Sequence, residues 1–132
     1  MMNREPVVVQ ESTRDWETWP DEDVADRGLV YWKTLVSADV THSEALTMGI
    51  ANIPPGEALH THRHLQAEIY LILQGRSLVR IDGNPQPVAA GSAVFIPGNA
   101  PHSCENTGAT DLQFTYVFPA NSFEEIEHIF EE

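Results

Sequence analysis

Short apolar segments bounded by turn residues recur between residues 29 and 119 of this 132-residue chain. Segments such as EIYLILQ, RSLVRID, SAVFIP and DLQFTYVF are rich in β-branched and aromatic residues. The intervening turns include Pro54-Pro55-Gly56 and Asp82-Gly83-Asn84, and an Asp-Gly pair is typical of a tight hairpin. Short strands separated by turns at this spacing predict an all-β sandwich or barrel over residues 29–119.

The two ends of the chain differ from this central part. Residues 1–28 are acidic and irregular, and we expect them to form an arm with Trp16 and Trp19 packed against the barrel. Residues 120–132 have Ser122 and Glu125 in capping-box spacing, followed by apolar residues at helical spacing. The sequence therefore predicts an N-terminal arm (1–28), a barrel (29–119) and a short C-terminal helix (120–132).

Charge and cysteine content exclude several classes of function. Asp and Glu number 20 against 7 Lys and Arg, for a formal net charge of −13. A nucleic-acid partner or an anionic membrane surface needs clustered positive charge, so neither is expected. The single cysteine, Cys104, excludes an intrachain disulfide, and we expect it to be a small buried residue. No stretch approaches the length of a membrane span, so we expect a cytoplasmic protein.

Three histidines alternate in the segment His60-Thr61-His62-Arg63-His64. Residues two apart in a strand share a face, so the three imidazoles are expected to point the same way. The next strand places Glu68 and Tyr70 on one face, and His102 follows about 34 residues after Glu68. Imidazole and carboxylate donors from adjacent strands suit a divalent first-row metal.

These spacings resemble the two sequence motifs of the cupin superfamily. The first motif is matched by Gly56, five residues, His62, one residue, His64, three residues, Glu68, six residues and Gly75. The second is matched by Gly91, five residues and Pro97, and then by His102, three residues and Asn106. One position departs from it, because Asn99 stands where the motif has a glycine. Since Asn tolerates a positive φ better than most residues, we expect this turn to form.

The resemblance implies a cupin jelly-roll barrel holding one divalent metal, namely iron, manganese, nickel, cobalt or zinc. It assigns His62, His64, Glu68 and His102 as the ligands. His60 is a competing ligand, but pairing it with His62 would break the motif spacing, so it is expected beside the site or at its rim. His42 and His128 are expected at the surface.

Within the cupins, the chain is similar to the small lyases that cleave dimethylsulfoniopropionate to dimethyl sulfide and acrylate. The stretches SEALTMGIANIPPGEAL, AEIY, GNAPH and FTYVFPANSFEEIE carry this similarity. It implies that Tyr70 is the catalytic base, and the alternative is that Tyr70 only packs within the barrel. As a departure, His128 stands where these lyases have a second tyrosine, which leaves the exact substrate open.

Other functions remain compatible with the same ligand set. A cupin dioxygenase would use an open metal position for oxygen and would not need Tyr70 as a base. A sugar isomerase would need a more polar pocket, and a non-catalytic module would only bind a small ligand. A metal-dependent lyase acting on a small organic acid is the preferred interpretation, and the resemblance also implies a homodimer.

Overall fold

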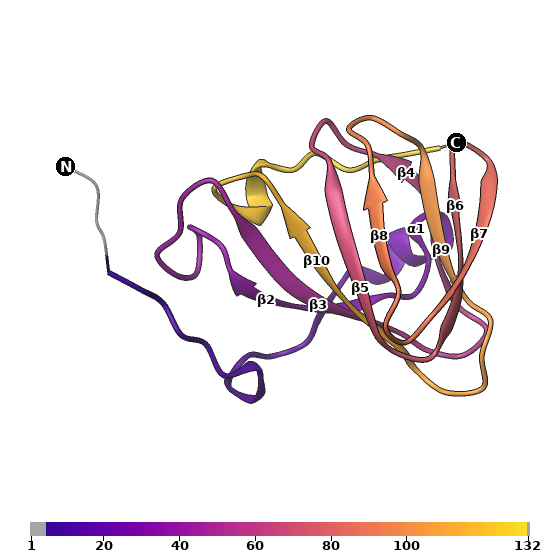
Figure 1. Ribbon diagram of the computed structural model, residues 1–132, viewed down its shortest axis with the longest axis horizontal. Coiled ribbons are helices and arrows are strands. Elements are labelled where there is room, and N and C mark those ends of the chain that lie inside the picture. Colours follow the sequence, from indigo (N-terminus) through magenta and orange to yellow (C-terminus); the bar gives the residue numbers. More distant parts are fainter. Residues whose placement is uncertain (1–4, 132) are drawn as a thin grey trace.

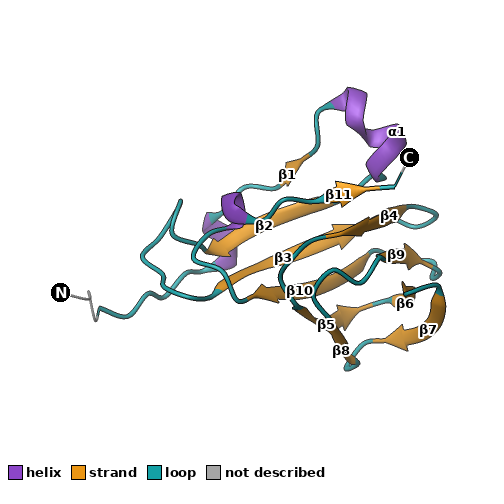
Figure 2. Cartoon of the chain, turned by 90° about the horizontal axis from the view of Figure 1, so that it is seen from above, coloured by secondary structure: helices purple, strands orange, loops and turns teal. Residues whose placement is uncertain are grey.

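The computed structural model describes residues 5–131, in which two antiparallel sheets face each other (Figures 1 and 2). The first sheet has the order β1-β2-β3-β10-β5-β8, and the second has the order β11-β4-β9-β6-β7. The strands of the first sheet are β1 (Glu17–Thr18), β2 (Tyr31–Val36), β3 (Thr47–Ile53), β10 (Leu112–Phe118), β5 (Glu68–Gln74) and β8 (Ala93–Ile96). Those of the second are β11 (Ile129–Phe130), β4 (Ala58–Arg63), β9 (His102–Asn106), β6 (Arg76–Ile81) and β7 (Asn84–Ala89).

The connections are those of a jelly roll. From β3 to β10 the chain crosses repeatedly from one sheet to the other, and within this stretch β6 and β7 form a hairpin in one sheet. Two sheets connected in this way enclose one core. A double-sheet jelly roll is also one of the folds by which all-β proteins limit the number of unpaired strand edges. The predicted all-β jelly-roll class is confirmed.

Alternation along the strands builds the core between the sheets. In β5, Glu68, Tyr70 and Ile72 are buried, whereas Ile69 and Leu71 on the opposite face are exposed. The apolar side chains of β10 alternate in the same way. Successive side chains of a strand point to opposite faces, so every second residue of these strands is available to line the barrel.

The N-terminal arm is attached to the barrel at several points. Strand β1 pairs with β2, and the short helix α1 (Val24–Arg27) lies against β4. Gly28 has a φ of 95°, and a Cβ built there would lie 1.7 Å from the Ala58 carbonyl oxygen, so only glycine allows this approach. The ring of Trp19 packs on that of Trp32 with centroids 4.6 Å apart, as expected, whereas Trp16 remains 42% exposed.

The expected C-terminal helix is not formed in residues 120–131, so that part of the prediction is wrong. The segment has one 3-10 turn, η3 (Phe123–Glu125), and then strand β11 pairs with β4. The Ser122 side chain makes no capping hydrogen bond. Acidic residues also fill the end of the segment, where they oppose a helix dipole, while the edge of β4 offers backbone partners. We call residues 119–131 the C-terminal strap.

Two 3-10 turns, η1 (Glu11–Thr13) and η2 (Asp21–Asp23), complete the arm. Among residues 5–131, no helix is long and apolar enough to cross a membrane.

Candidate metal centre

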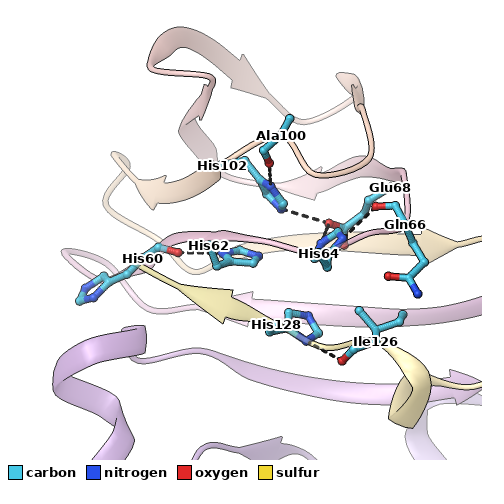
Figure 3. Close-up of polar contacts among 9 residues, drawn as sticks. All are labelled: His60, His62, His64, Gln66, Glu68, Ala100, His102, Ile126 and His128. Atoms are coloured by element: carbon cyan, nitrogen blue, oxygen red, sulfur yellow. Dashed lines mark hydrogen bonds and ion pairs between the residues drawn. The ribbon is translucent and has the colours of Figure 1, made fainter. Parts of the chain in front are cut away.

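Three buried histidines meet at one end of the barrel (Figure 3). His62 lies in β4, His64 follows β4 directly, and His102 is the first residue of β9. Each imidazole is at most 2% exposed. One ring nitrogen from each of the three lies within 4.8 Å of the others, so the group could hold a metal ion.

Backbone carbonyls fix which nitrogen each ring presents. The Nδ1 atoms of His62, His64 and His102 lie 2.8, 2.9 and 2.8 Å from the carbonyl oxygens of His60, Gln66 and Ala100. A carbonyl can only accept, so each Nδ1 carries the proton and donates it. The Nε2 lone pairs of all three rings are therefore left to bind a ligand, an arrangement common around metal-binding histidines.

Glu68 supplies a carboxylate to the same cluster. One of its oxygens lies 3.1 Å from Nε2 of His64 and 3.3 Å from Nε2 of His102. Burial alone would raise the pKa of the Glu68 carboxyl, but the contacts with His102 and His64 outweigh burial and hold this pKa below its usual value. Glu68 is therefore held as a carboxylate that can accept from, or share a ligand with, the neighbouring imidazoles.

The imidazoles differ in their affinity for protons. Burial, followed by the neighbouring His102, lowers the pKa of His62 to about 3. Burial also opposes protonation of His64, but its hydrogen bond to Glu68 prevails and raises the pKa of His64. His64 is thus the more basic of these two imidazoles, and its Nε2 contacts the Glu68 carboxylate.

The donor set fits a divalent metal. Nε2 of His102 is buried and has no hydrogen-bond partner of acceptable geometry among the described residues. An unpartnered buried nitrogen costs free energy unless something binds it. Three imidazole lone pairs and one carboxylate suit iron, manganese, nickel, cobalt or zinc.

His60 lies outside this cluster. It is exposed, and its Nδ1 lies 2.9 Å from the carbonyl oxygen of Asp26 in α1. The pairing of β4 with β9 shifts between Leu59 and His62, so a bulge interrupts the expected alternation. His60 therefore does not share the face of His62, although its carbonyl holds the His62 ring.

His128 lies over the cluster, and the expectation of a surface position is wrong. Its ring centroid is 5.3 Å from that of His64 and 5.7 Å from that of His62. Burial, followed by the charge of His64, lowers the pKa of His128 to about 4. Its position follows from the strap, which the sequence suggested was a helix. The departure from the lyase pattern at this residue was the one signal pointing to it.

A small cavity of about 40 Å³ adjoins the cluster. Its wall is mostly aromatic, and within the described residues no Lys or Arg side chain lines it. The ionisable groups in the wall are Glu68, Tyr70, Tyr116, His62 and His128. The aromatic and apolar wall residues are Trp19, Val30, Trp32, Ala51, Leu59, Phe114, Phe118 and Phe123. The sequence did not single out Trp19 or Phe123 for this wall.

Tyr70 belongs to both the wall and the core. It is 1% exposed, and its ring centroid lies 4.4 Å from that of Phe114 and 6.4 Å from that of His102. Burial, followed by the negative charge of Glu68, raises the pKa of Tyr70 well above its ordinary value. Cys104 is fully buried, contacts the Ser77 hydroxyl at 3.3 Å and does not line the cavity.

Residues 49–118 match the cupin domain family. The chain is a cupin. Dimethylsulfoniopropionate lyase DddW of Ruegeria pomeroyi is 42% identical over 103 residues, which are 78% of this cupin and 67% of that protein. An oxalate-binding protein of Thermotoga maritima is 36% identical over 92 residues, 69% of this chain and 76% of that protein.

A solved structure gives the same architecture. The crystal structure of a predicted oxalate decarboxylase from Thermotoga maritima superimposes with a TM-score of 0.74 and 32% identity. It covers 86% of this cupin and 99% of the other chain. The names of these relatives thus point to two different small molecules, dimethylsulfoniopropionate and oxalate. The residues that line the site are therefore needed to choose between the two.

Proposed function

We propose that this cupin is a metal-dependent lyase that converts dimethylsulfoniopropionate to dimethyl sulfide and acrylate. The observation that carries the proposal is the position of Tyr70, which lines the cavity two residues after Glu68 on the same strand face. The 42% identity to a dimethylsulfoniopropionate lyase supports it.

We assign His62, His64, Glu68 and His102 as ligands of one divalent metal, with their Nε2 and carboxylate atoms as donors. When bound, the metal would supply a Lewis acid for the substrate carboxylate and a positive charge that opposes the effects of burial and Glu68 on the Tyr70 pKa. With three imidazoles and one carboxylate, a six-coordinate site keeps two positions open, as catalytic sites do.

Tyr70 is the proposed base. In its phenolate form, its oxygen takes the proton α to the substrate carboxylate. The electron pair of the broken C–H bond forms the C=C bond of acrylate, and the C–S bond breaks with its electrons going to sulfur. Dimethyl sulfide leaves as a neutral molecule, and the phenol returns its proton to solvent. A base placed in this way contributes about 10²–10⁴-fold to the rate.

The wall of the cavity favours this substrate over oxalate. Oxalate carries two negative charges and has no cationic group that could contact an aromatic wall. No Lys or Arg of the described residues lines the cavity, whereas aromatic rings do. Aromatic faces attract cations such as a sulfonium. A non-catalytic binder, as in the oxalate-binding relative, is the second candidate.

The deciding experiment is metal analysis of the purified protein, followed by an assay of dimethyl sulfide release with and without oxygen. The lyase predicts bound metal and equal release under both conditions. Oxygen consumption and loss of activity without oxygen would instead indicate a dioxygenase. Bound metal without turnover, together with oxalate binding, would indicate the binder.

We also propose that the protein is a homodimer joined through the outer face of β5 and β8. Ile69 and Phe95 are direct cross-strand partners on this face, with exposures of 48% and 63%, and Leu71 and Leu73 extend the patch. Contiguous apolar surface of this kind commonly marks an interface. Light scattering should give twice the mass of one chain, and Phe95→Glu should shift the protein to monomer.

The cytoplasmic location of the protein stays a prediction.

A further inference from the structure

Both ends of the chain contribute side chains to the wall of the cavity, and we call these side chains its cover. Trp19 of the arm and Phe123 and His128 of the strap all line the cavity. Its volume of about 40 Å³ holds only a few water molecules, because one water occupies at least about 10–15 Å³ on this measure. An organic substrate therefore needs part of this cover to move.

One side chain joins the two halves of the cover. The guanidinium carbon of Arg27 lies 4.9 Å from the centroid of the Trp19 ring and 5.2 Å from that of Phe130. The two rings also meet edge to face, with centroids 5.8 Å apart. The guanidinium of Arg27 thus contacts Trp19 in the arm and Phe130 in the strap at the same time. Both distances are within the range of a cation–π interaction.

The last residues of the strap, 127–131, are held by few backbone hydrogen bonds. Strand β11 has two residues paired with β4, and the Glu131 amide donates to the Thr61 carbonyl at 3.2 Å. The arm is fixed by β1, by the bond from His60 to Asp26 and by the close contact of Gly28 with Ala58. The start of the strap is tied to the barrel, because the Thr47 hydroxyl donates to the Ala120 carbonyl, the Ala38 amide donates to the Asn121 carbonyl, and the Ser37 hydroxyl accepts from the Phe123 amide. Opening that breaks few backbone hydrogen bonds is therefore confined to residues 127–131.

We propose that Arg27 is a positioning residue that holds the mouth closed, and that the end of the C-terminal strap, residues 127–131, is the part that swings away to admit a ligand. Arg27 acts through the rings of Trp19 and Phe130, and it does not line the cavity itself. The proposal concerns access to the cavity and does not depend on the lyase reaction.

The first test measures how fast the cavity histidines react with diethyl pyrocarbonate in chelator-treated protein, with sites resolved by mass spectrometry. His62, His64 and His102 report opening, and exposed His60 on the same chain is the internal reference. Arg27→Ala should speed labelling of the three by about tenfold, equivalent to about 1.4 kcal/mol. Arg27→Lys should keep most of the protection, and Arg76→Ala on β6 is the matched control.

Two results of this test would overturn the proposal. If Arg27→Ala labels at the wild-type rate, Arg27 does not hold the mouth closed. If His60 accelerates together with the buried histidines, the arm has detached and the strap is not the moving part. Circular dichroism checks that each variant keeps the fold.

A disulfide lock tests the strap directly. Arg63 and Ile129 are exposed cross-strand partners on β4 and β11, so Arg63→Cys/Ile129→Cys can be bridged on the outer face. Native Cys104 is fully buried and does not interfere. Oxidation should slow labelling at least about tenfold, and reduction should restore it. The control pair, Arg76→Cys/Ala89→Cys between β6 and β7, should have no effect. Equal labelling of the oxidised and reduced lock would rule out the strap as the route of entry.

Discussion

Phe130 covers one face of His62: the ring centroids are 5.0 Å apart and the planes are inclined by 30°. The two residues are also strand partners in the pairing of β11 with β4. Covering the imidazole removes it from water, and burial is the main reason why the pKa of His62 falls to about 3. His62 therefore keeps its Nε2 lone pair throughout the physiological pH range.

His128 should make the stability of the metal-free protein depend on pH. Its pKa is about 4 in the folded state, from a usual value of 6.5. Between these values the unfolded chain binds a proton that the folded state does not, so stability falls as the pH decreases through this window. His128→Phe removes this contribution, which is about 1.4 kcal/mol per pH unit. Urea unfolding between pH 7.5 and 4 should give a shallower loss for the variant, and parallel curves would contradict the prediction.

Each proposed ligand should be needed for metal binding. Replacing His62, His64, Glu68 or His102 by Ala removes one donor, and metal affinity should fall at least about a hundredfold. His60→Ala is the control, because its side chain points away from the cluster while its carbonyl, which holds His62, is retained. Metal content by mass spectrometry after dialysis measures the effect. An empty site in His60→Ala with a filled site in His64→Ala would show that the assigned ligands are wrong.

Tyr70→Phe should separate base catalysis from packing. The ring and its contact with Phe114 remain, but the group that takes the proton is lost. Turnover of dimethylsulfoniopropionate should fall by about 10²–10⁴-fold, while metal content and unfolding midpoint stay close to wild type. Tyr31→Phe is the control, since Tyr31 does not line this cavity. A Tyr70→Phe protein with full metal and most of its activity would leave the metal site intact and disprove the base.

Asn99 should tolerate glycine but not alanine. It has a φ of 64°, and its amide donates to the His64 carbonyl at 2.8 Å. Asn99→Ala should lower the free energy of unfolding by about 1 kcal/mol, because alanine has a Cβ but no polar side chain that makes a positive φ tolerable. Asn99→Gly should be nearly neutral, because glycine adopts a positive φ freely. Asn84→Ala in the β6–β7 hairpin is the comparison. If denaturant unfolding shows that the Asn99→Gly protein is less stable than the Asn99→Ala protein, then φ does not control this turn.

The alternation of β5 was predictable because a strand buried on one side repeats every two residues. Glu68 and Tyr70 face inward and Ile69 faces outward, as the sequence indicated. His60 was not predictable in the same way, because the bulge before His62 reverses the face and has no local signal. The motif spacing excluded His60 as a ligand where periodicity alone included it.

The C-terminal segment shows a second limit. The apolar residues of the strap have helical spacing, but the decision between helix and strand depends on Thr61 and His62, whose backbone is distant in sequence. Long-range pairing of this kind overrides local propensity. The position of His128 over the cluster is a consequence of that pairing, so it could not be derived from local pattern.

The three Nδ1 contacts of the cluster all go to main-chain carbonyls close by in the sequence, and these belong to the barrel itself. Main-chain contacts thus orient these imidazoles, and the metal is not needed to set which nitrogen each ring presents. A zinc finger unfolds when a chelator removes its zinc, because folding and metal binding occur together in that domain. In this barrel we expect the fold to persist without the ion, so chelator-treated protein should accept one ion after another and allow the activity of each to be compared on a single preparation.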